Sequence, residues 1–252
     1  ISLQDKQNSS FRPLIPDSRT PKMLHLTLST SCPFRCVMCP QDHDAPAMLD
    51  TDVLKRQIKW EEIDEVLLQG GELLAISRAR DFYRWLTREK SRQANVITNG
   101  VLLDEEWMDD LLNGANWVEV SVNAASERMY TLVHGQNHFD RVAGRIRQMT
   151  TLKQERSCPT VIRFHFTIIP ENLEEIPSAI RLAEDLGCDM VTYCYDRSVP
   201  ALLDDEPDLR HDLRSQIQER LAGTQIKIRG QFLEHLGLLE YSWAPERIVY
   251  CV

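Results

Sequence analysis

The strongest constraint on the fold is a strand-then-helix alternation that repeats along most of the chain. Short apolar or alternating stretches are each followed by a longer stretch with apolar residues at helical spacing. Six such units in series predict parallel strands with right-handed crossovers, either in a doubly wound sheet or in a partial (β/α)6 barrel. We expect strands at 23–29, 64–69, 95–100, 117–123, 160–169 and 189–196, and helices at 51–62, 77–90, 104–115, 139–153, 172–187 and 208–223.

Unusual polar residues follow the ends of these predicted strands. A cysteine-rich segment, 32–39, follows the first strand, Gly-Gly-Glu at 70–72 follows the second, and Thr-Asn-Gly at 98–100 ends the third. Ser121 and Asn123 end the fourth. In both candidate folds, functional sites gather where the carboxyl ends of the parallel strands meet. The sequence therefore predicts one shared site at that rim.

The charge balance and the cysteine usage limit the partners and the compartment. The net charge is −9 over 252 residues, which argues against nucleic acid or a membrane surface as a partner. No apolar stretch reaches the roughly 18 residues of a membrane span. Seven cysteines without a disulfide-like pattern favour a reducing cytoplasm, where clustered thiols bind metal or do redox work.

The chain divides into three expected segments. Residues 1–22 contain three prolines among polar residues and predict an extended N-terminal arm. The barrel is expected at 23–222, and 223–252 form a C-terminal extension. Because the chain begins at Ile1 rather than Met, we expect it to be a fragment, or only the ordered part, of a longer protein.

Cys32, Cys36 and Cys39 form the motif C-x3-C-x2-C, which has two metal interpretations. In the first, His43 completes a Cys3His zinc site. In the second, three thiolates hold three irons of a 4Fe–4S cluster, and the fourth iron is open to an outside ligand. Structural zinc usually supplies folding energy to domains too small for a core, and six β-α units do not need it. The cluster is therefore favoured over zinc, and over three unligated thiols.

The ordered set of motifs resembles the radical S-adenosylmethionine (radical SAM) superfamily. The resemblance covers residues 24–196 and includes the cysteine motif, "GGE" and "TNG", each after its strand. The segments 118–149 and 167–191 resemble a subgroup that often carries a C-terminal auxiliary-cluster domain, called SPASM or twitch. The resemblance implies that residues 223–252 begin such a domain, and that an auxiliary iron–sulfur cluster accompanies the first.

This resemblance implies cofactors and residue roles. The cofactors are a 4Fe–4S cluster on Cys32, Cys36 and Cys39, and S-adenosylmethionine bound through the open iron. The implied cofactor-binding residues are Met38 through its backbone, Gly70 and Gly71 through close approach of the backbone, Glu72 through the methionine ammonium, Asn99, Ser121 and Asn123. Asn99 has an equally good interpretation as the cap of its own turn.

Two other cysteines and one histidine carry separate interpretations. Cys251, after the sixth helix, is a candidate auxiliary-cluster ligand first, a hydrogen donor to a substrate radical second, and a tail cysteine without a role third. Cys194 lies on the predicted sixth strand and is expected in the core, where free cysteine is common. His165 alternates with apolar residues and is expected as a hydrogen-bonded interior residue.

The resemblance implies an enzyme that cleaves S-adenosylmethionine reductively to a 5′-deoxyadenosyl radical, which takes a hydrogen atom from a substrate. The expected substrate is a peptide that is cross-linked, epimerised or matured. The alternative is dehydrogenation or epimerisation of a small polar metabolite such as a sugar or aminocyclitol. The expected electron donor is a flavodoxin or ferredoxin. The competing class is a non-catalytic Cys3His zinc module.

Overall fold

The fold is a curved, fully parallel sheet, described by a computed structural model at residues 23–230, 232–233, 236–238 and 249–250. The strand order is β7-β6-β5-β4-β3-β2-β1-β8, with every pairing parallel. This confirms the predicted α/β partial barrel and excludes the doubly wound order. The strands are β1 (Met23–Thr27), β2 (Glu65–Gln69), β3 (Gln93–Thr98), β4 (Trp117–Ser121), β5 (Val161–Ile168), β6 (Met190–Tyr195), β7 (Lys227–Arg229) and β8 (Val249–Tyr250).

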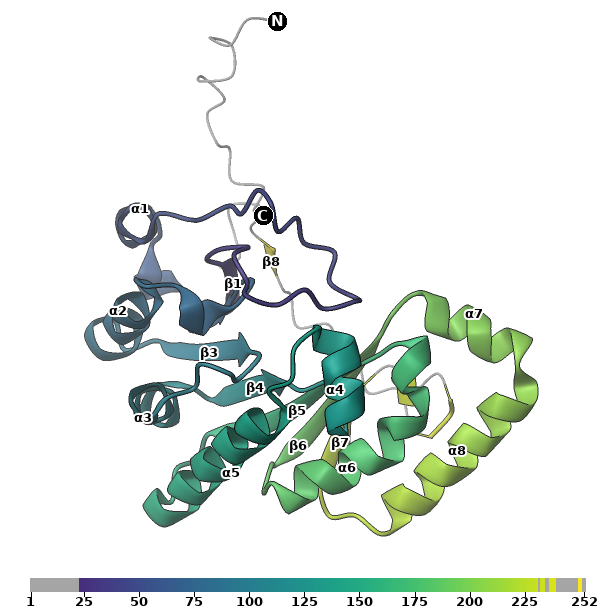
Figure 1. Cartoon of the computed structure of the whole chain (residues 1–252). Helices are drawn as coiled ribbons and strands as arrows, with labels where there is room; N and C mark the ends of the chain where they lie inside the picture. The colour runs from purple at the N-terminus through teal and green to yellow at the C-terminus, as the bar shows by residue number, and fades with distance from the viewer. Residues whose placement is uncertain (1–22, 231, 234–235, 239–248, 251–252) are drawn as a thin grey trace, which may run out of the picture.

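Helices connect consecutive strands and lie along the outer side of the curved sheet (Figure 1). The predicted helix 51–62 is two shorter helices, and 77–90 continues from an α-helix into a π-helical turn. Two helices, α4 (Glu127–His134) and α7 (Ser198–Asp205), were not predicted. The helices are α1 (Thr51–Gln57), η1 (Trp60–Glu62), η2 (Leu73–Ala75), α2 (Ala79–Arg84), η3 (Trp85–Glu89), α3 (Glu105–Gly114), α4 (Glu127–His134), α5 (Phe139–Arg156), η4 (Pro170–Glu175), α6 (Ile176–Asp185), α7 (Ser198–Asp205) and α8 (Pro207–Ala222).

The two faces of the sheet differ in polarity, as β5 illustrates. Phe164 and Phe166 are fully buried in the core between the sheet and the helices. The alternate residues Arg163, His165 and Thr167 are half-buried and face the inner, concave side. The alternation therefore gives the barrel an apolar outer wall and a polar interior.

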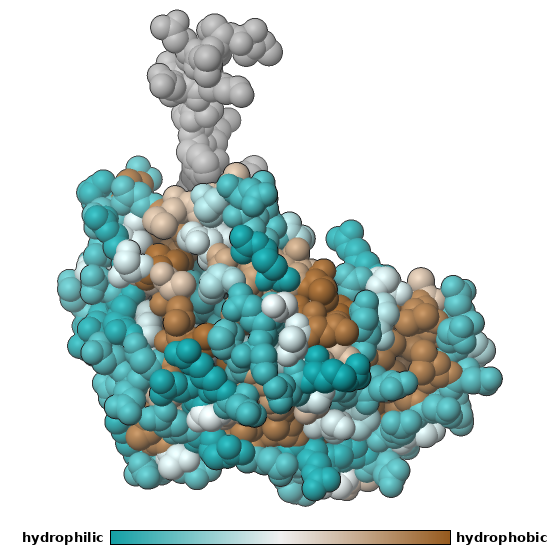
Figure 2. Space-filling model, in the orientation of Figure 1, coloured by the Kyte–Doolittle hydropathy of each residue, from teal (hydrophilic) through white to brown (hydrophobic). Residues whose placement is uncertain are grey.

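The face in Figure 2 is largely hydrophilic, and its apolar side chains occur in separate groups. In the part of the chain that the structure describes, no helix is both long and apolar enough to cross a membrane.

The predicted flanking segments are only partly described. The arm at 1–22 and residues 251–252 lie outside the described residues. Within 223–252, β7 pairs with β6 and β8 pairs with β1, so both short strands extend the sheet of the barrel. The assignment of 223–252 to a SPASM or twitch domain remains a prediction.

Candidate functional site

The three motif cysteines lie on the loop that leaves the carboxyl end of β1, and all three are half-buried, free thiols. The backbone N–H of Phe34 donates to Cys32 Sγ (3.4 Å). The backbone N–H of Cys39 donates to the carbonyl of Cys36 (3.0 Å), which closes a turn between them. The N–H of Val37 donates to the carbonyl of Val133 (2.9 Å). The loop is therefore curled and anchored to α4.

Gly70 and Gly71 bring the loop after β2 into backbone contact with the cysteine loop. The N–H of Gly71 donates to the Ser29 carbonyl at 2.6 Å. A Cβ at Gly71 would lie 2.2 Å from the carbonyl oxygen of Ser31, and one at Gly70 would lie 2.5 Å from that of Ser29. No side chain fits either gap. The glycines thus make room for the cysteine loop, and their predicted contact with the methionine ammonium is not tested by this geometry.

Glu72 joins the loops after β2 and β3. Its side chain is 1% exposed. Oε1 accepts from the N–H of Leu74 (3.0 Å) and the hydroxyl of Thr98 (2.6 Å), and Oε2 accepts from the N–H of Asn99 (2.7 Å). Burial raises the pKa of Glu72, against these three hydrogen bonds, which lower it. The carboxylate holds two rim loops in place, and its predicted ammonium contact stays a prediction.

Asn99 is buried beside Glu72 and supports both of its interpretations. Its Oδ1 accepts from the backbone N–H of Val101 (3.1 Å), which confirms the turn-capping role. Its Nδ2 is buried and has no hydrogen-bond partner among the described residues. Because a buried donor without an acceptor is costly, this amide fits a site where a bound cofactor supplies the acceptor.

Ser121 and Asn123 lie at the end of β4, as predicted, and the Asn123 side chain is already hydrogen-bonded within the protein. Ser121 is half-buried and pairs in register with His165 on β5. Asn123 has a left-handed backbone (φ 57°). Its Oδ1 accepts from the N–H of Thr167 (2.7 Å), and its carbonyl accepts from the Asn172 amide (3.1 Å). Asn123 therefore joins β4 to β5, and its contact with a cofactor remains a prediction.

Two predicted site residues remain, Met38 and Cys251. Met38 is half-buried and packs against the core beside the cysteine loop. Its backbone contact with the cofactor remains a prediction. Cys251 lies outside the described residues, so its three interpretations stay open.

His134 is a site residue that the sequence did not reveal. Its Nδ1 lies 3.1 Å from Cys36 Sγ, and its Nε2 lies 2.9 Å from the carbonyl of Val122. Since a carbonyl only accepts, Nε2 carries the proton, and Nδ1 accepts from the Cys36 thiol. Burial lowers the pKa of His134 to about 4, although the Val122 hydrogen bond raises it. The sequence signals that could have predicted its helix, α4, are the N-cap residue Ser126 and the C-terminal Gly135.

The donor set is three thiols on one loop, which are the ligands that iron–sulfur clusters use. Burial raises the pKa of Cys32, and burial with the neighbouring Cys32 and Cys39 thiols raises that of Cys36 to about 12. These thiols need a strong local positive charge to ionise together. Across the described ranges, no three His, Cys, Asp or Glu side chains converge to hold one metal ion.

Among the described residues, His43 does not join the three cysteines in a group that could hold one metal ion, so the structure gives the Cys3His zinc alternative no support. Zinc holds every ligand at about 2.0–2.3 Å from one centre, and Cys36 pairs with His134 instead of His43. A 4Fe–4S cluster instead needs its sulfurs at separate corners.

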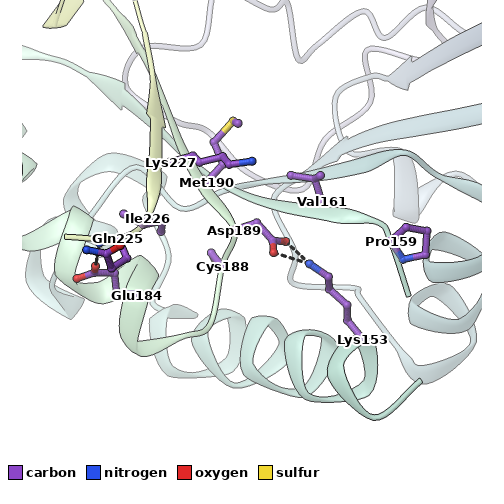
Figure 3. A pocket seen from close by; sticks show the side chains of 10 residues that line it. All are labelled: Lys153, Pro159, Val161, Glu184, Cys188, Asp189, Met190, Gln225, Ile226 and Lys227. Carbon is purple, nitrogen blue, oxygen red and sulfur yellow. Dashed lines mark hydrogen bonds and ion pairs between the residues drawn. The ribbon is translucent and has the colours of Figure 1, made fainter. Parts of the chain in front are cut away.

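A pocket of about 470 Å³ lies at the opposite end of the barrel (Figure 3). It includes the first residues of β5, β6 and β7, namely Val161, Met190 and Lys227. Lys153 and Asp189 form an ion pair at 2.5 Å on its wall, and Asp189 also accepts from the Ile162 N–H (2.7 Å). Because the pocket lies where these strands begin, it is separate from the cysteine rim at the carboxyl ends of the strands.

A parallel partial barrel with a three-cysteine loop after its first strand defines the class of iron–sulfur enzymes that act with S-adenosylmethionine. The Radical SAM superfamily model matches residues 26–183. The chain belongs to the radical SAM superfamily, which confirms the expected family, its 4Fe–4S cluster and its S-adenosylmethionine.

Curated relatives match the barrel. A probable GTP 3′,8-cyclase of Saccharolobus islandicus (strain Y.N.15.51 / Yellowstone #2) is 27% identical over 169 residues, covering 65% of this chain and 53% of that protein. A probable GTP 3′,8-cyclase of Thermoplasma volcanium is 23% identical over 175 residues, covering 64% and 50%. The chain thus spans about half the length of the curated relatives it matches.

Solved structures share the fold. Streptococcus suis SuiB bound to the precursor peptide SuiA has a TM-score of 0.66 at 14% identity, covering 90% of this chain and 53% of that one. Native anSMEcpe with bound AdoMet and the Cp18Cys peptide has a TM-score of 0.61 at 17% identity, covering 82% and 62%. These similarities establish the fold over nearly the whole chain.

Proposed function

We propose that this chain is the barrel of a radical SAM enzyme that modifies a peptide. When bound, the cofactors supply a 5′-deoxyadenosyl radical, which takes a hydrogen atom from a substrate carbon. Cys32, Cys36 and Cys39 hold the cluster, His134 lies directly against Cys36, and Glu72 fixes the rim loops. The half-buried polar residues Ser121 and His165 line the interior, where a substrate's hydrogen must be presented.

The observation that carries the peptide assignment is the fold shared with two peptide-bound proteins. SuiB with SuiA matches 90% of this chain, and anSMEcpe with its Cp18Cys peptide matches 82%. The electron donor is proposed to be a flavodoxin or ferredoxin, since the reaction begins with one electron.

A second candidate substrate is a purine nucleotide. It is favoured by the probable GTP 3′,8-cyclases, which are among the curated proteins that match this chain in sequence. The similarity lies in the shared barrel, and the chain covers only 53% of the first of these proteins. A small polar metabolite such as a sugar or aminocyclitol is the third candidate.

Deuterium transfer distinguishes these classes. The cluster is reconstituted anaerobically, and the protein is reduced in the presence of S-adenosylmethionine and a perdeuterated mixture of peptides, nucleotides or sugars. Transfer to 5′-deoxyadenosine, detected by mass, identifies the class that supplies the hydrogen. We expect label from the peptides. Label from GTP or sugars alone would overturn the peptide assignment, and no 5′-deoxyadenosine in any mixture would overturn the radical chemistry.

A further inference from the structure

Glu119, His165 and Cys194 contact one another in series on the inner face of β4, β5 and β6, apart from the cysteine loop. Residues paired in register on parallel strands point to the same face. Glu119 shares its face with Ser121, which pairs with His165, and Thr167 pairs with Cys194. Cys194 Sγ lies 3.4 Å from His165 Nε2. The expectation that Cys194 is a core residue is wrong, because its side of β6 faces the interior and the residue is exposed.

Glu119 and Thr192 fix the orientation of the His165 imidazole. Nδ1 lies 3.3 Å from Glu119 Oε1 and 2.9 Å from Thr192 Oγ1. The single hydroxyl proton of Thr192 goes to Glu119 Oε2 (2.9 Å), so Thr192 must accept from His165. Nδ1 therefore carries a proton, and the Nε2 lone pair of a neutral imidazole faces both the Cys194 thiol and the Thr167 hydroxyl, which lies 3.2 Å from Nε2 and 3.4 Å from Cys194 Sγ. This arrangement places a base against a nucleophile, with a carboxylate behind the base.

The electrostatics support a reactive thiol. The surrounding protein partly shields the Cys194 thiol from water although the residue is exposed at the surface, which raises its pKa, but the hydrogen bond and charge of His165 outweigh this and the net pKa is lowered. Burial lowers the pKa of His165, but Cys194 and the Glu119 carboxylate outweigh it, and the net pKa is raised. The opposite case is Cys188, where burial with the nearby Asp189 raises the pKa to about 12.

We propose that Cys194, His165 and Glu119 form a second reactive site, in which Cys194 attacks an electrophilic carbon such as that of a carbonyl or a conjugated double bond. His165 takes the thiol proton, and the sulfur forms a bond to the carbon. The displaced electron pair moves to the far atom of the double bond, which receives the proton from His165. Glu119 is a positioning residue for the imidazole. No oxidant or reductant is needed, so this step is independent of cofactor cleavage.

Acrylamide, a small conjugated electrophile, tests this proposal directly. The cluster-loaded protein is treated anaerobically at pH 7, and the modification of each cysteine is followed by peptide mass mapping. We expect Cys194 to react about 10-fold or more faster than Cys158 and Cys188, because the thiolate is the nucleophile. A Cys194 rate no greater than that of Cys158 in the unsubstituted protein would overturn the proposal, whatever the variants do.

Two variants and one control assign the roles. His165→Ala is expected to slow acrylamide addition to Cys194 about 10-fold, Glu119→Gln to slow it less, and His211→Ala, on the exposed side of α8, to leave it unchanged. An unchanged rate in His165→Ala, with the fold verified by circular dichroism, would also overturn the proposal.

The pH profile separates activation from mere packing. In the unsubstituted protein, the Cys194 rate should rise with a midpoint below the ordinary thiol value of 9.0, and in His165→Ala the midpoint should move upward. Equal midpoints would contradict the assigned role of His165. The ionisable groups around Cys194 on neighbouring elements are Glu119 on β4, Arg163 and His165 on β5, Asp196 after β6, and Arg229 on β7.

Discussion

Glu72 Oε2 accepts a hydrogen bond from the backbone nitrogen of Asn99 at 2.7 Å, and this bond ties the loop after β2 to the loop after β3. The same carboxylate also accepts from Leu74 and Thr98. One buried side chain therefore sets the relative positions of two loops at the rim that carries the cysteines.

Replacing Glu72 by Gln should destabilise the protein. A glutamine can keep its oxygen toward Leu74 and Thr98 only by turning its NH₂ group against the Asn99 N–H. The lost bond and the unsatisfied buried donor predict a fall of about 1–3 kcal/mol in the free energy of unfolding. Urea denaturation of the apoprotein measures it. Glu62→Gln, whose side chain is 46% exposed, is the control and should change stability by less than about 0.5 kcal/mol. Equal effects would contradict the buried role of Glu72.

Gly71→Ala should impair cluster loading. The new Cβ would meet the Ser31 carbonyl oxygen at 2.2 Å, so the cysteine loop would have to move. We expect less iron and sulfide per chain after anaerobic reconstitution. Gly144→Ala is the matched control, since its Cβ would meet nothing within 4 Å inside α5. It should load normally and gain about 0.5–1 kcal/mol of stability from helix propensity. Full loading of Gly71→Ala would show that the loop tolerates the shift.

Each of Cys32→Ala, Cys36→Ala and Cys39→Ala should lose the cluster and the cleavage of S-adenosylmethionine. Loss of a residue that merely supports a ligand costs about 10–100-fold in metal affinity or activity, and loss of a ligand should cost at least as much. Iron content and 5′-deoxyadenosine are the readouts. Cys158→Ala, on the segment before β5, should retain both. A triple variant that still forms 5′-deoxyadenosine would refute the assigned ligands.

His134→Ala and His43→Ala should have opposite outcomes. His134 is buried between Cys36 and the Val122 carbonyl, so its loss leaves a polar group unpaired and is expected to cost about 1–3 kcal/mol. It should also lower iron loading, because the space left beside Cys36 lets the cysteine loop shift. His43→Ala should keep the iron. Thermal unfolding and iron analysis check both variants. Loss of metal in His43→Ala with normal loading of His134→Ala would reverse this assignment.

The rim could be predicted from the sequence because parallel strands share one direction. Once strands and helices alternate, the residues after each strand must meet at one edge, which places Cys32, Glu72 and Asn99 together without knowledge of any contact. The sequence predicted a close backbone approach of Gly70 and Gly71 to the cofactor, and did not indicate that both glycines pack against the loop after β1. Their tightest contacts are to Ser29 and Ser31, about forty positions earlier, and such a contact depends on the register between β1 and β2.

Cys194 was misplaced because local pattern does not specify which face of a buried parallel strand is polar. Aromatic residues on both sides of Cys194 favour a core position, yet only Tyr193 is among the buried residues. His165, Thr192 and Cys194 become one cluster only through the pairing of β5 with β6. His134 was missed for a similar reason, since 98 positions separate it from Cys36.

The backbone contact between Gly71 and Ser31 has a consequence for recombining this barrel with related ones. Because no atom can be added between the two loops, a chimera with a crossover between residues 31 and 71 would combine surfaces that were selected separately. In such chimeras, the cysteine segment and the Gly-Gly-Glu segment should therefore be taken together from the same parent protein.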